Sequence, residues 1–267
     1  MKVVLFCGGL GLRLRDNSMT LPKPLVSVGG IPILWHEMRY YAHYGHRDFI
    51  LCLGFKGDVI KDYFLKHTEA LSNDFVLSNG GRDIELLQRD MADWRISFID
   101  TGIGSSIGQR LHAIRGHLEG EDVFLANYGD VLTDAPLNEI VQDFLAQGKI
   151  AAFLSVQPTN YTFHLVRMED GGLVRGMDDV KTSGLWINGG HFIFRREIFD
   201  YIGPGEDLVL EPFDRLIEEE QLLAYKHEGF WAPLDTLKDL ELLESRYEAG
   251  HTPWAVWQGE PSDPRTR

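Results

Sequence analysis

The sequence is poor in cysteine and in long apolar runs. Only Cys7 and Cys52 occur among its 267 residues, and both stand inside short apolar stretches. We therefore interpret them as buried thiols and not as a disulfide framework. The apolar start at residues 3–7 is far too short for a signal peptide or a membrane span. These absences predict a cytoplasmic protein with no membrane partner.

Positive charge is also scarce, with 26 Lys and Arg against 40 Asp and Glu and a formal net charge of −14. Proteins that coat nucleic acids need clustered Lys and Arg to neutralise phosphates, so this balance argues against a nucleic-acid partner. A small polyphosphate ligand stays compatible, because a few local cations and a divalent metal can reverse the field inside one cleft. A role of the acidity in solubility alone is the other interpretation.

Several catalytic motifs are missing. The ten histidines show neither H-E-x-x-H nor a zinc-binding spacing, and no G-x-S-x-G or Walker A sequence occurs. The dinucleotide fingerprint G-x-G-x-x-G fails because Leu14 stands where its third glycine belongs. These gaps argue against a zinc enzyme, a P-loop protein and a nicotinamide-dependent oxidoreductase.

The first half of the chain instead alternates strands with helices. Apolar runs predict strands at 3–6, 49–53, 95–99 and 123–126, and the segments between them predict helices at 31–44, 59–65 and 107–118. This alternation indicates an α/β fold, a Rossmann-like, doubly wound and mostly parallel sheet with right-handed crossovers.

The second half is richer in strands. Strand-like pieces lie close together, separated by Asp-Gly and Gly-Gly turns, at 151–157, 162–168, 173–177 and 187–194. We expect them to form a β-rich layer over the carboxyl edge of the sheet, followed by helices at 211–220 and 236–247. The chain is thus expected to form one domain, residues 1–257, with halves of about 1–149 and 150–257 and a flexible tail at 258–267.

The loop "CGGLGLRLR" at residues 7–15 is both flexible and cationic. Its glycines would let backbone N–H groups approach phosphate oxygens, and Arg13 would supply a fork of donors. A turn with solvated arginines also explains these nine residues. The following Pro22-Lys23-Pro24 favours the phosphate site, because two prolines restrict the backbone beneath the flexible ammonium of Lys23.

These motifs together resemble the sugar-1-phosphate nucleotidyltransferases. "GGLGLRL" and "PKPLVSVGG" are similar to the amino-terminal signature of that family, G-G-x-G-[ST]-R-L followed by P-K-P. Nearly the whole chain resembles its glucose-1-phosphate cytidylyltransferases, through "DTG", "YGD", "INGG" and "GFWAPLDTLKD" in the same order and spacing. The resemblance implies a nucleotide-binding first half and a sugar-binding second half.

The resemblance implies a reaction in which a sugar 1-phosphate oxygen attacks the α-phosphorus of a nucleoside triphosphate and pyrophosphate leaves. Positioning and charge neutralisation then do most of the catalytic work. The resemblance assigns the triphosphate and α-phosphate contacts to Arg13 and Lys23, and the binding of Mg²⁺ to Asp130 and Asp235. Taken alone, Asp130 would be a turn residue and Asp235 a helix N-cap. The backbone cradle for the phosphates would be formed by Gly8, Gly9 and Gly11.

The resemblance also implies contacts to the base and the acceptor. It places Ser105, Ser106 and Arg110 beside the nucleobase, although a helix N-cap followed by a surface arginine explains them almost as well. A hairpin corner is likewise the other interpretation of the Asn-Gly pair. The residues expected at the acceptor are Tyr128, His164, Lys181, Asn188 and Gly189.

Some positions depart from the family pattern. Asp178-Asp179-Val180 stands where the family has Glu-Lys-Pro, whose lysine contacts the sugar phosphate, and only Lys181 or Arg175 lies near in sequence to replace it. His164 replaces a glycine common beside the sugar, and Leu12 and Leu21 replace a hydroxyl and a basic residue. We therefore hypothesise an active enzyme whose acceptor differs from plain glucose 1-phosphate, such as another sugar phosphate, a cyclitol phosphate or a phosphonate.

Three points stay open at the level of sequence. Cytidine is favoured by the overall resemblance alone, so thymidine, uridine and guanosine remain alternatives. A non-catalytic nucleotide-sugar-binding protein is the rival class, although such a relative would more readily lose its metal carboxylates. The resemblance further implies a homo-oligomer of unstated order.

Overall fold

The computed structural model describes residues 1–9, 21–87, 89, 91–158 and 163–258. Gly11, Leu12, Arg13 and the tail from residue 259 lie outside these described residues, so the predictions made for them stay predictions. Among the described residues, no helix is both long enough and apolar enough to cross a membrane.

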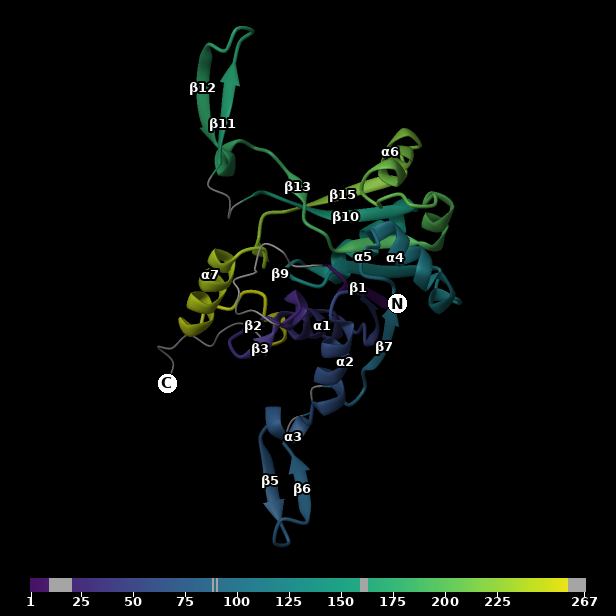
Figure 1. Cartoon of the computed structure of the whole chain (residues 1–267), viewed down its shortest axis with the longest axis vertical. Coiled ribbons are helices and arrows are strands. Elements are labelled where there is room, and N and C mark those ends of the chain that lie inside the picture. The colour runs from purple at the N-terminus through teal and green to yellow at the C-terminus, as the bar shows by residue number, and fades with distance from the viewer. Residues whose placement is uncertain (10–20, 88, 90, 159–162, 259–267) are drawn as a thin grey trace.

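One mixed sheet organises the chain (Figure 1). Its strands follow the order β7-β4-β1-β8-β14-β10, and β10 also pairs with β13 near its end and with β15. Neighbours among β7, β4, β1 and β8 run parallel, whereas β14 is antiparallel to both β8 and β10. The eight strands are β1 (Val3–Phe6), β4 (Asp48–Leu53), β7 (Arg95–Asp100), β8 (Val123–Tyr128), β10 (Ala151–Val156), β13 (Ile187–Asn188), β14 (Phe192–Arg195) and β15 (Leu222–His227).

Helices cover both faces of this sheet because successive residues of a strand point to opposite faces. Val3 and Leu5 of β1 pack with α1, α2 and α5, whereas Val4 and Phe6 pack with α4 and α6. The helices are α1 (Ile33–His43), α2 (Gly57–Lys66), α3 (Glu69–Ser72), α4 (Ile107–Ile114), α5 (Leu137–Gln147), α6 (Glu211–Glu218) and α7 (Leu237–Glu248).

Four short two-stranded ladders surround the sheet. Two of them, β5–β6 and β11–β12, project from opposite ends of the molecule (Figure 1). Of the other two, β9–β16 lies beside the carboxyl end of β8 and positions two residues of the site below. The pairs are β2 (Ser27–Val28) with β3 (Ile31–Pro32), β5 (Phe75–Ser78) with β6 (Asp83–Leu86), β9 (Val131–Thr133) with β16 (Trp231–Pro233), and β11 (His164–Met168) with β12 (Val174–Asp179).

The predicted α/β fold with a parallel sheet core is confirmed, and two details differ from expectation. Four strands of the second half, β10, β13, β14 and β15, extend the central sheet, whereas β11 and β12 form a projecting hairpin and β16 pairs with β9, so the expected β-rich layer is not formed as a separate unit. The helix expected at 31–44 begins at Ile33, because residues 31–32 pair with 27–28 and Pro32 is extended with ψ 141°. The free, buried thiols of Cys7 and Cys52 agree with their interpretation from sequence.

Candidate active site

A cavity of about 490 Å³ opens at the carboxyl ends of β1 and β8. These strands are parallel neighbours, with Phe6 in register with Tyr128, and Gly129 N donates to Phe6 O at 3.2 Å, so the first residues after the two strands lie side by side. Open α/β sheets bind ligands at this edge, where the strand order changes direction. The lining residues are Phe6, Cys7, Gly8, Gly9, Lys23, Pro24, Ser105, Ser106, Ile107, Arg110, Tyr128, Gly129, Asp130, Asp207 and Asp235.

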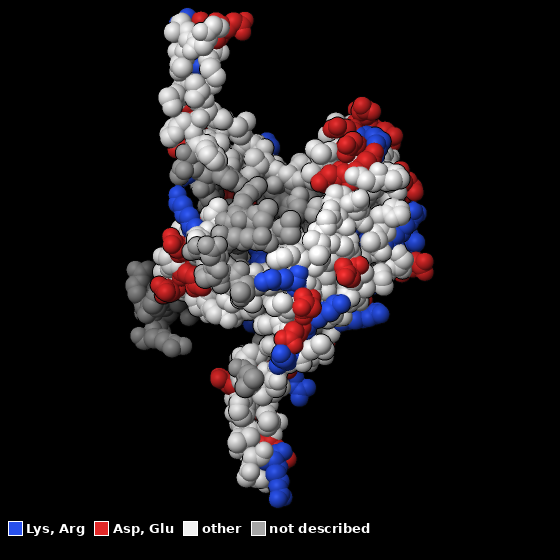
Figure 2. All heavy atoms as spheres, viewed as in Figure 1, with Lys and Arg blue, Asp and Glu red and all other residues white. Residues whose placement is uncertain are grey.

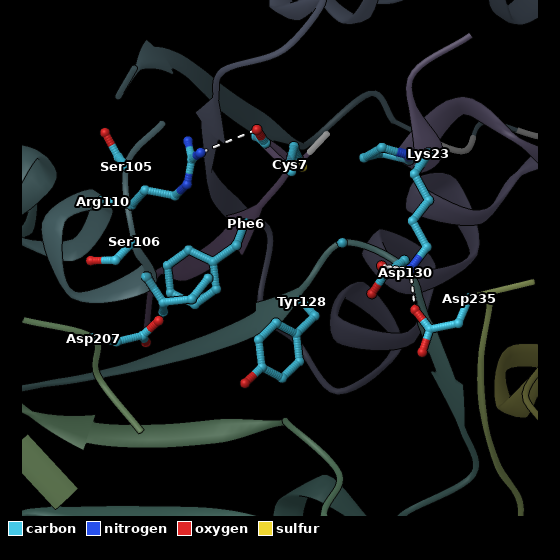
Figure 3. Close-up of a pocket in the computed structure, with 15 residues that line it drawn as sticks. Phe6, Cys7, Lys23, Ser105, Ser106, Arg110, Tyr128, Asp130, Asp207 and Asp235 are labelled. Atoms are coloured by element: carbon cyan, nitrogen blue, oxygen red, sulfur yellow. Dashed lines mark hydrogen bonds and ion pairs between the residues drawn. The ribbon is translucent and has the colours of Figure 1, made fainter. Parts of the chain in front are cut away.

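The cavity therefore brings together nine of the residues predicted from sequence. They come from five separate segments of the chain, and Figure 3 shows them at two ends of one pocket, with Tyr128 between. Lys23, Asp130 and Asp235 form one end, which we call the charged end. Ser105, Ser106, Arg110 and Asp207 form the other, which we call the serine end.

At the charged end, one ammonium joins two carboxylates. Lys23 Nζ lies 2.6 Å from Asp235 Oδ1 and forms an ion pair with Asp130, and all three side chains are largely buried. Burial alone would lower the pKa of Lys23, but the two carboxylates outweigh it and hold that pKa above its ordinary value. Burial raises the pKa of Asp130, and Lys23 acts against that rise.

The β9–β16 ladder explains why two carboxylates so far apart in sequence meet. Asp130 directly precedes β9 and Asp235 follows closely after β16, and these strands pair antiparallel with Val131 opposite Pro233. A further bond from Leu234 N to Asp130 O, 2.9 Å long, closes the ladder beside the carboxylates. Asp235 is not a helix cap: Thr236 caps α7 and forms a capping box with Asp239.

This pair of carboxylates fits a magnesium site. Carboxylate oxygens are hard ligands, and Mg²⁺ in such enzymes usually takes one or two protein carboxylates together with substrate phosphates. Both carboxylates contact the same nitrogen atom, so one small cation could contact both. In the described part of the chain no group of three or more His, Cys, Asp and Glu side chains could hold a metal. A cation on these two carboxylates would complete its shell with water or with phosphate oxygens.

At the serine end, Arg110 is buried and bonded to the ends of three parallel strands. Its guanidinium donates to the backbone oxygen of Leu53, the last residue of β4, at 3.1 Å, to Gly8 O after β1 at 3.1 Å, and to Thr101 Oγ1 after β7 at 2.7 Å. A Cβ on Gly8 would lie 1.9 Å from the Arg110 guanidinium, so a side chain at this position would displace Arg110 from its hydrogen bonds. The sequence-based alternative of a surface arginine is wrong, since Arg110 is 3% exposed.

Ser106 does form the helix cap that the sequence alone suggested. It begins α4 in a capping box with Gln109, and its hydroxyl also donates to Glu206 O at 2.7 Å. Ser105 donates its hydroxyl to the Thr101 backbone oxygen. Tyr128 borders both ends of the cavity, and burial raises its pKa to about 12, so the phenol stays a hydrogen-bond donor at neutral pH.

The predicted acceptor residues do not line this cavity, with the exception of Tyr128. His164 and Lys181 are exposed, at the start of β11 and in the 3-10 turn η4 (Val180–Thr182) after β12. Asp179 Oδ1 accepts from Lys181 N at 2.9 Å. Arg175, the other cation considered for the acceptor phosphate, pairs with Glu169 within the same hairpin.

Hydrogen bonds from buried side chains of neighbouring elements hold the loop after β13. Asn188 is exposed, Gly189 is buried, and the Gly189 carbonyl accepts from Trp231 Nε1 at 2.8 Å. His191 has a left-handed backbone with φ 48°, and its N–H donates to Asn127 Oδ1 at 2.8 Å. Asn127 in turn donates to Glu37 Oε1 at 2.8 Å, so α1 and β8 together fix the loop.

Sequence reasoning missed Glu37 and Asp207. Glu37 lies on the apolar face of α1 and is 2% exposed. An ionisable residue among apolar neighbours on one helix face is the sequence signal that could have identified it. Burial raises the pKa of Glu37 well above its ordinary value, which favours the protonated acid. Asp207 lies in the loop before α6, and no local motif marks it, because only the fold brings that loop to the serine end.

Comparison with known proteins identifies the family. The Nucleotidyl transferase family model matches residues 2–249. A glucose-1-phosphate cytidylyltransferase of Salmonella typhi is 34% identical over 97% of this chain and 100% of its own length. A probable glucose-1-phosphate cytidylyltransferase of Bacillus subtilis is 33% identical over 96% and 100%. The crystal structure of HddC from Yersinia pseudotuberculosis shares the fold, with a TM-score of 0.64 at 18% identity, covering 92% of this chain and 99% of that one. The chain therefore belongs to the nucleotidyl transferase family.

Proposed function

We propose that this enzyme transfers the cytidylyl group of CTP to a sugar 1-phosphate with the help of Mg²⁺, releasing pyrophosphate and a CDP-sugar. The observation that carries the proposal is the charged end, where Lys23, Asp130 and Asp235 meet beside the glycine loop after β1. The relatives named glucose-1-phosphate cytidylyltransferase, matched over their full length, support it.

The chain's own groups suit this chemistry. The acceptor phosphate is already an anion, so the protein must bring two anions together and neutralise charge, and it needs no covalent intermediate. Lys23 contributes a cation beside the transferred phosphorus, and the glycine loop contributes backbone donors. Asp130 and Asp235 would hold Mg²⁺, which supplies further charge neutralisation on the phosphates.

The serine end would then receive the base. The triphosphate needs the charged end, so the nucleoside extends along Tyr128 toward Ser105, Ser106 and Asp207 (Figure 3). Asp207 Oδ1 is buried with no hydrogen-bond partner among the described residues, and an unpaired buried carboxylate oxygen calls for a donor from a ligand. The exocyclic amino group of cytosine is such a donor, whereas uracil and thymine carry an acceptor at that position.

An acceptor other than plain glucose 1-phosphate is the second candidate. Asp179, which replaces the family's lysine, accepts from the Lys181 backbone, and Arg175 is paired with Glu169. A sugar phosphate of different stereochemistry, a cyclitol phosphate or a phosphonate would fit an altered set of contacts. Lys181, in the exposed turn after β12, is the cation of this segment for which we propose a phosphate contact.

We further propose that the protein is a homo-oligomer. The hairpins β5–β6 and β11–β12 expose large apolar side chains, among them Leu77, Ile84, Met168 and Met177. Figure 2 shows both arms as mostly uncharged surface with charged residues near their ends. Two-stranded hairpins are marginally stable alone in water, so a second copy covering them would stabilise them.

Pyrophosphate release with Mg²⁺, measured across CTP, UTP, dTTP and GTP and a panel of sugar and cyclitol phosphates, tests the function. We expect turnover with CTP and at least one phosphate, and its loss in Asp130→Asn. Absence of turnover with every pair, in protein shown to be folded, would exclude the enzyme. Calorimetric binding of a CDP-sugar without any turnover would instead support a non-catalytic binding protein.

A further inference from the structure

Lys23 stands at the centre of the proposed metal site. Its Nζ is 2.6 Å from Asp235 Oδ1 and also contacts the carboxylate of Asp130 (Figure 3). A cation shared by the two carboxylates would lie close to where this nitrogen lies now. The ammonium of the free protein and a metal bound by both carboxylates therefore compete for one position.

The two carboxylates are held by backbone, and the ammonium is not. The β9–β16 ladder and the 2.9 Å bond from Leu234 N to Asp130 O keep the backbone of both acids in place. Lys23 has a fixed backbone in η2 (Lys23–Leu25), between two prolines, but its ammonium ends a flexible stem of four carbons. When charges of the same sign must share this space, the lysine side chain is the part that can move.

Two partly buried carboxylates also need a counter-ion before any substrate binds. Neighbouring carboxylates repel each other when both are ionised, and burial increases the cost. In the free protein, the ammonium of Lys23 touches both acids and contributes positive charge to each. A nucleoside triphosphate would offer the Lys23 ammonium other partners, because its phosphate oxygens are anionic hydrogen-bond acceptors.

We propose that Lys23 is the counter-ion that occupies the metal position in the free enzyme, and that a divalent cation binds both carboxylates only when Lys23 moves to the phosphates of the nucleotide. The proposal rests on the proposed function for the identity of these phosphates. It makes metal and nucleotide binding mutually dependent: each must raise the affinity for the other by the same factor. Free metal alone then binds the free enzyme weakly.

Titration of the free, full-length protein with Mn²⁺, followed by the electron paramagnetic resonance of unbound Mn²⁺, tests this without any turnover. Lys23→Met removes the competing charge and keeps the length of the stem. We expect Lys23→Met to bind Mn²⁺ about tenfold more tightly than the wild type, within the usual range of coupling between ligands. Lys66→Met is the matched control, because Lys66 pairs with one exposed carboxylate, Asp62, at 2.7 Å, and it should leave Mn²⁺ affinity unchanged.

Further variants test whether the Lys23 variants are folded and whether Mn²⁺ binds at the two carboxylates and not elsewhere on the protein. Lys23→Gln should show the same gain, and thermal unfolding with and without Mn²⁺ should show a larger metal-dependent stabilisation in both Lys23 variants than in the wild type. Adding Asp130→Asn to Lys23→Met should remove the gain. Equal Mn²⁺ affinity in wild type and folded Lys23 variants, or a gain that survives Asp130→Asn, would overturn the proposal.

The outcome is separable from that of the proposed function. Pyrophosphate release by the wild type with no gain in the Lys23 variants would remove only the counter-ion role. A gain in Mn²⁺ affinity with no pyrophosphate release from any substrate pair would remove only the proposed transfer reaction and leave the competition between Lys23 and the metal supported.

Discussion

At the scale of single residues, Arg110 shows how a charge can serve the site through the backbone. Its guanidinium bonds Gly8, Leu53 and Thr101, which lie at or just after the carboxyl ends of three adjacent parallel strands. A buried cation bonded to the Gly8 carbonyl oxygen fixes the start of the loop that we expect to receive the triphosphate. We therefore classify Arg110 as a positioning residue, even though it also borders the cavity.

Arg110→Met should lower the free energy of unfolding by about 2–4 kcal/mol, because it leaves several buried acceptors without donors. Urea unfolding followed by fluorescence measures this change. Arg95→Met is the control, because the Arg95 side chain is 76% exposed in its pair with Asp48, and it should change stability by less than about 0.5 kcal/mol. Equal effects of the two substitutions would contradict the positioning role.

Asp207→Asn should alter the choice of base. The amide keeps the size of the side chain but replaces an acceptor oxygen by an NH₂ donor, which suits uracil O4 better than a cytosine amino group. We expect the ratio of kcat/KM for CTP to that for UTP to fall by about tenfold or more, the worth of one charge-assisted hydrogen bond. Initial rates of pyrophosphate release with both nucleotides give this ratio. An unchanged ratio with raised KM for the acceptor would place Asp207 at the sugar instead.

At the scale of elements, the buried strands and the projecting β11–β12 hairpin were predicted from the sequence, whereas the β5–β6 hairpin was not. The strands β1, β4 and β8 are continuous apolar runs, because helices cover both of their faces. In β5 all four residues are exposed, so no alternation of burial reveals it, and only the turn at 79–81 marks the hairpin. The second half was recognisable as strands, but sequence spacing could not show that they extend the same sheet.

The candidate site was predictable to a similar extent. Residues in loops directly after apolar strands are expected at the carboxyl edge of the sheet. Asp130, which follows β8, lines the cavity at that edge. Asp207 and Glu37 lack such motifs, because their neighbours come from other segments and are set by tertiary packing. The Lys23 bridge was equally hidden, since the β9–β16 pairing that joins Asp130 to Asp235 leaves no local signal.

The exposed hairpin β5–β6 carries a prediction of its own. Leu77 and Ile84 are paired across the hairpin and are 57% and 56% exposed. If a second copy covers them, replacing both by serine should dissociate the oligomer, as measured by light scattering after size exclusion. Leu145→Ser on α5, where the side chain is 46% exposed, is the control and should leave the oligomer intact. An unchanged mass for the double variant would exclude this arm from the interface.

At the scale of the whole molecule, acidity is unevenly placed. The chain carries a net charge of −14, and Figure 2 shows acidic side chains gathered over α6. The described lining of the candidate site holds two cations, Lys23 and Arg110, beside the carboxylates of Asp130, Asp207 and Asp235. A polyphosphate would therefore need a divalent cation to reverse the field in this cavity, and the net repulsion should make nucleotide association faster as salt screens it.

Buried histidines make the stability of the whole molecule depend on pH. Burial lowers the pKa of His36, and it lowers that of His46 to about 4 and that of His191 to about 3. Below the unfolded pKa of about 6.5, the unfolded chain binds protons that the folded chain refuses, so stability falls as pH falls. Glu37 acts in the opposite direction, because burial raises its pKa.

The contribution of His191 can be isolated by His191→Phe. Between about pH 6.5 and pH 4.5 the wild type should lose about 1.4 kcal/mol per pH unit through this one histidine, the value of one proton. Urea unfolding at several pH values in this window should therefore show a shallower slope for the variant, whatever the variant does to stability at pH 7. The exposed His112→Gln should keep the wild-type slope. If the unfolding free energy of the variant changes with pH as steeply as that of the wild type, His191 takes up a proton in the folded enzyme as well. The network through Asn127 would then have to join a protonated His191 to an ionised Glu37.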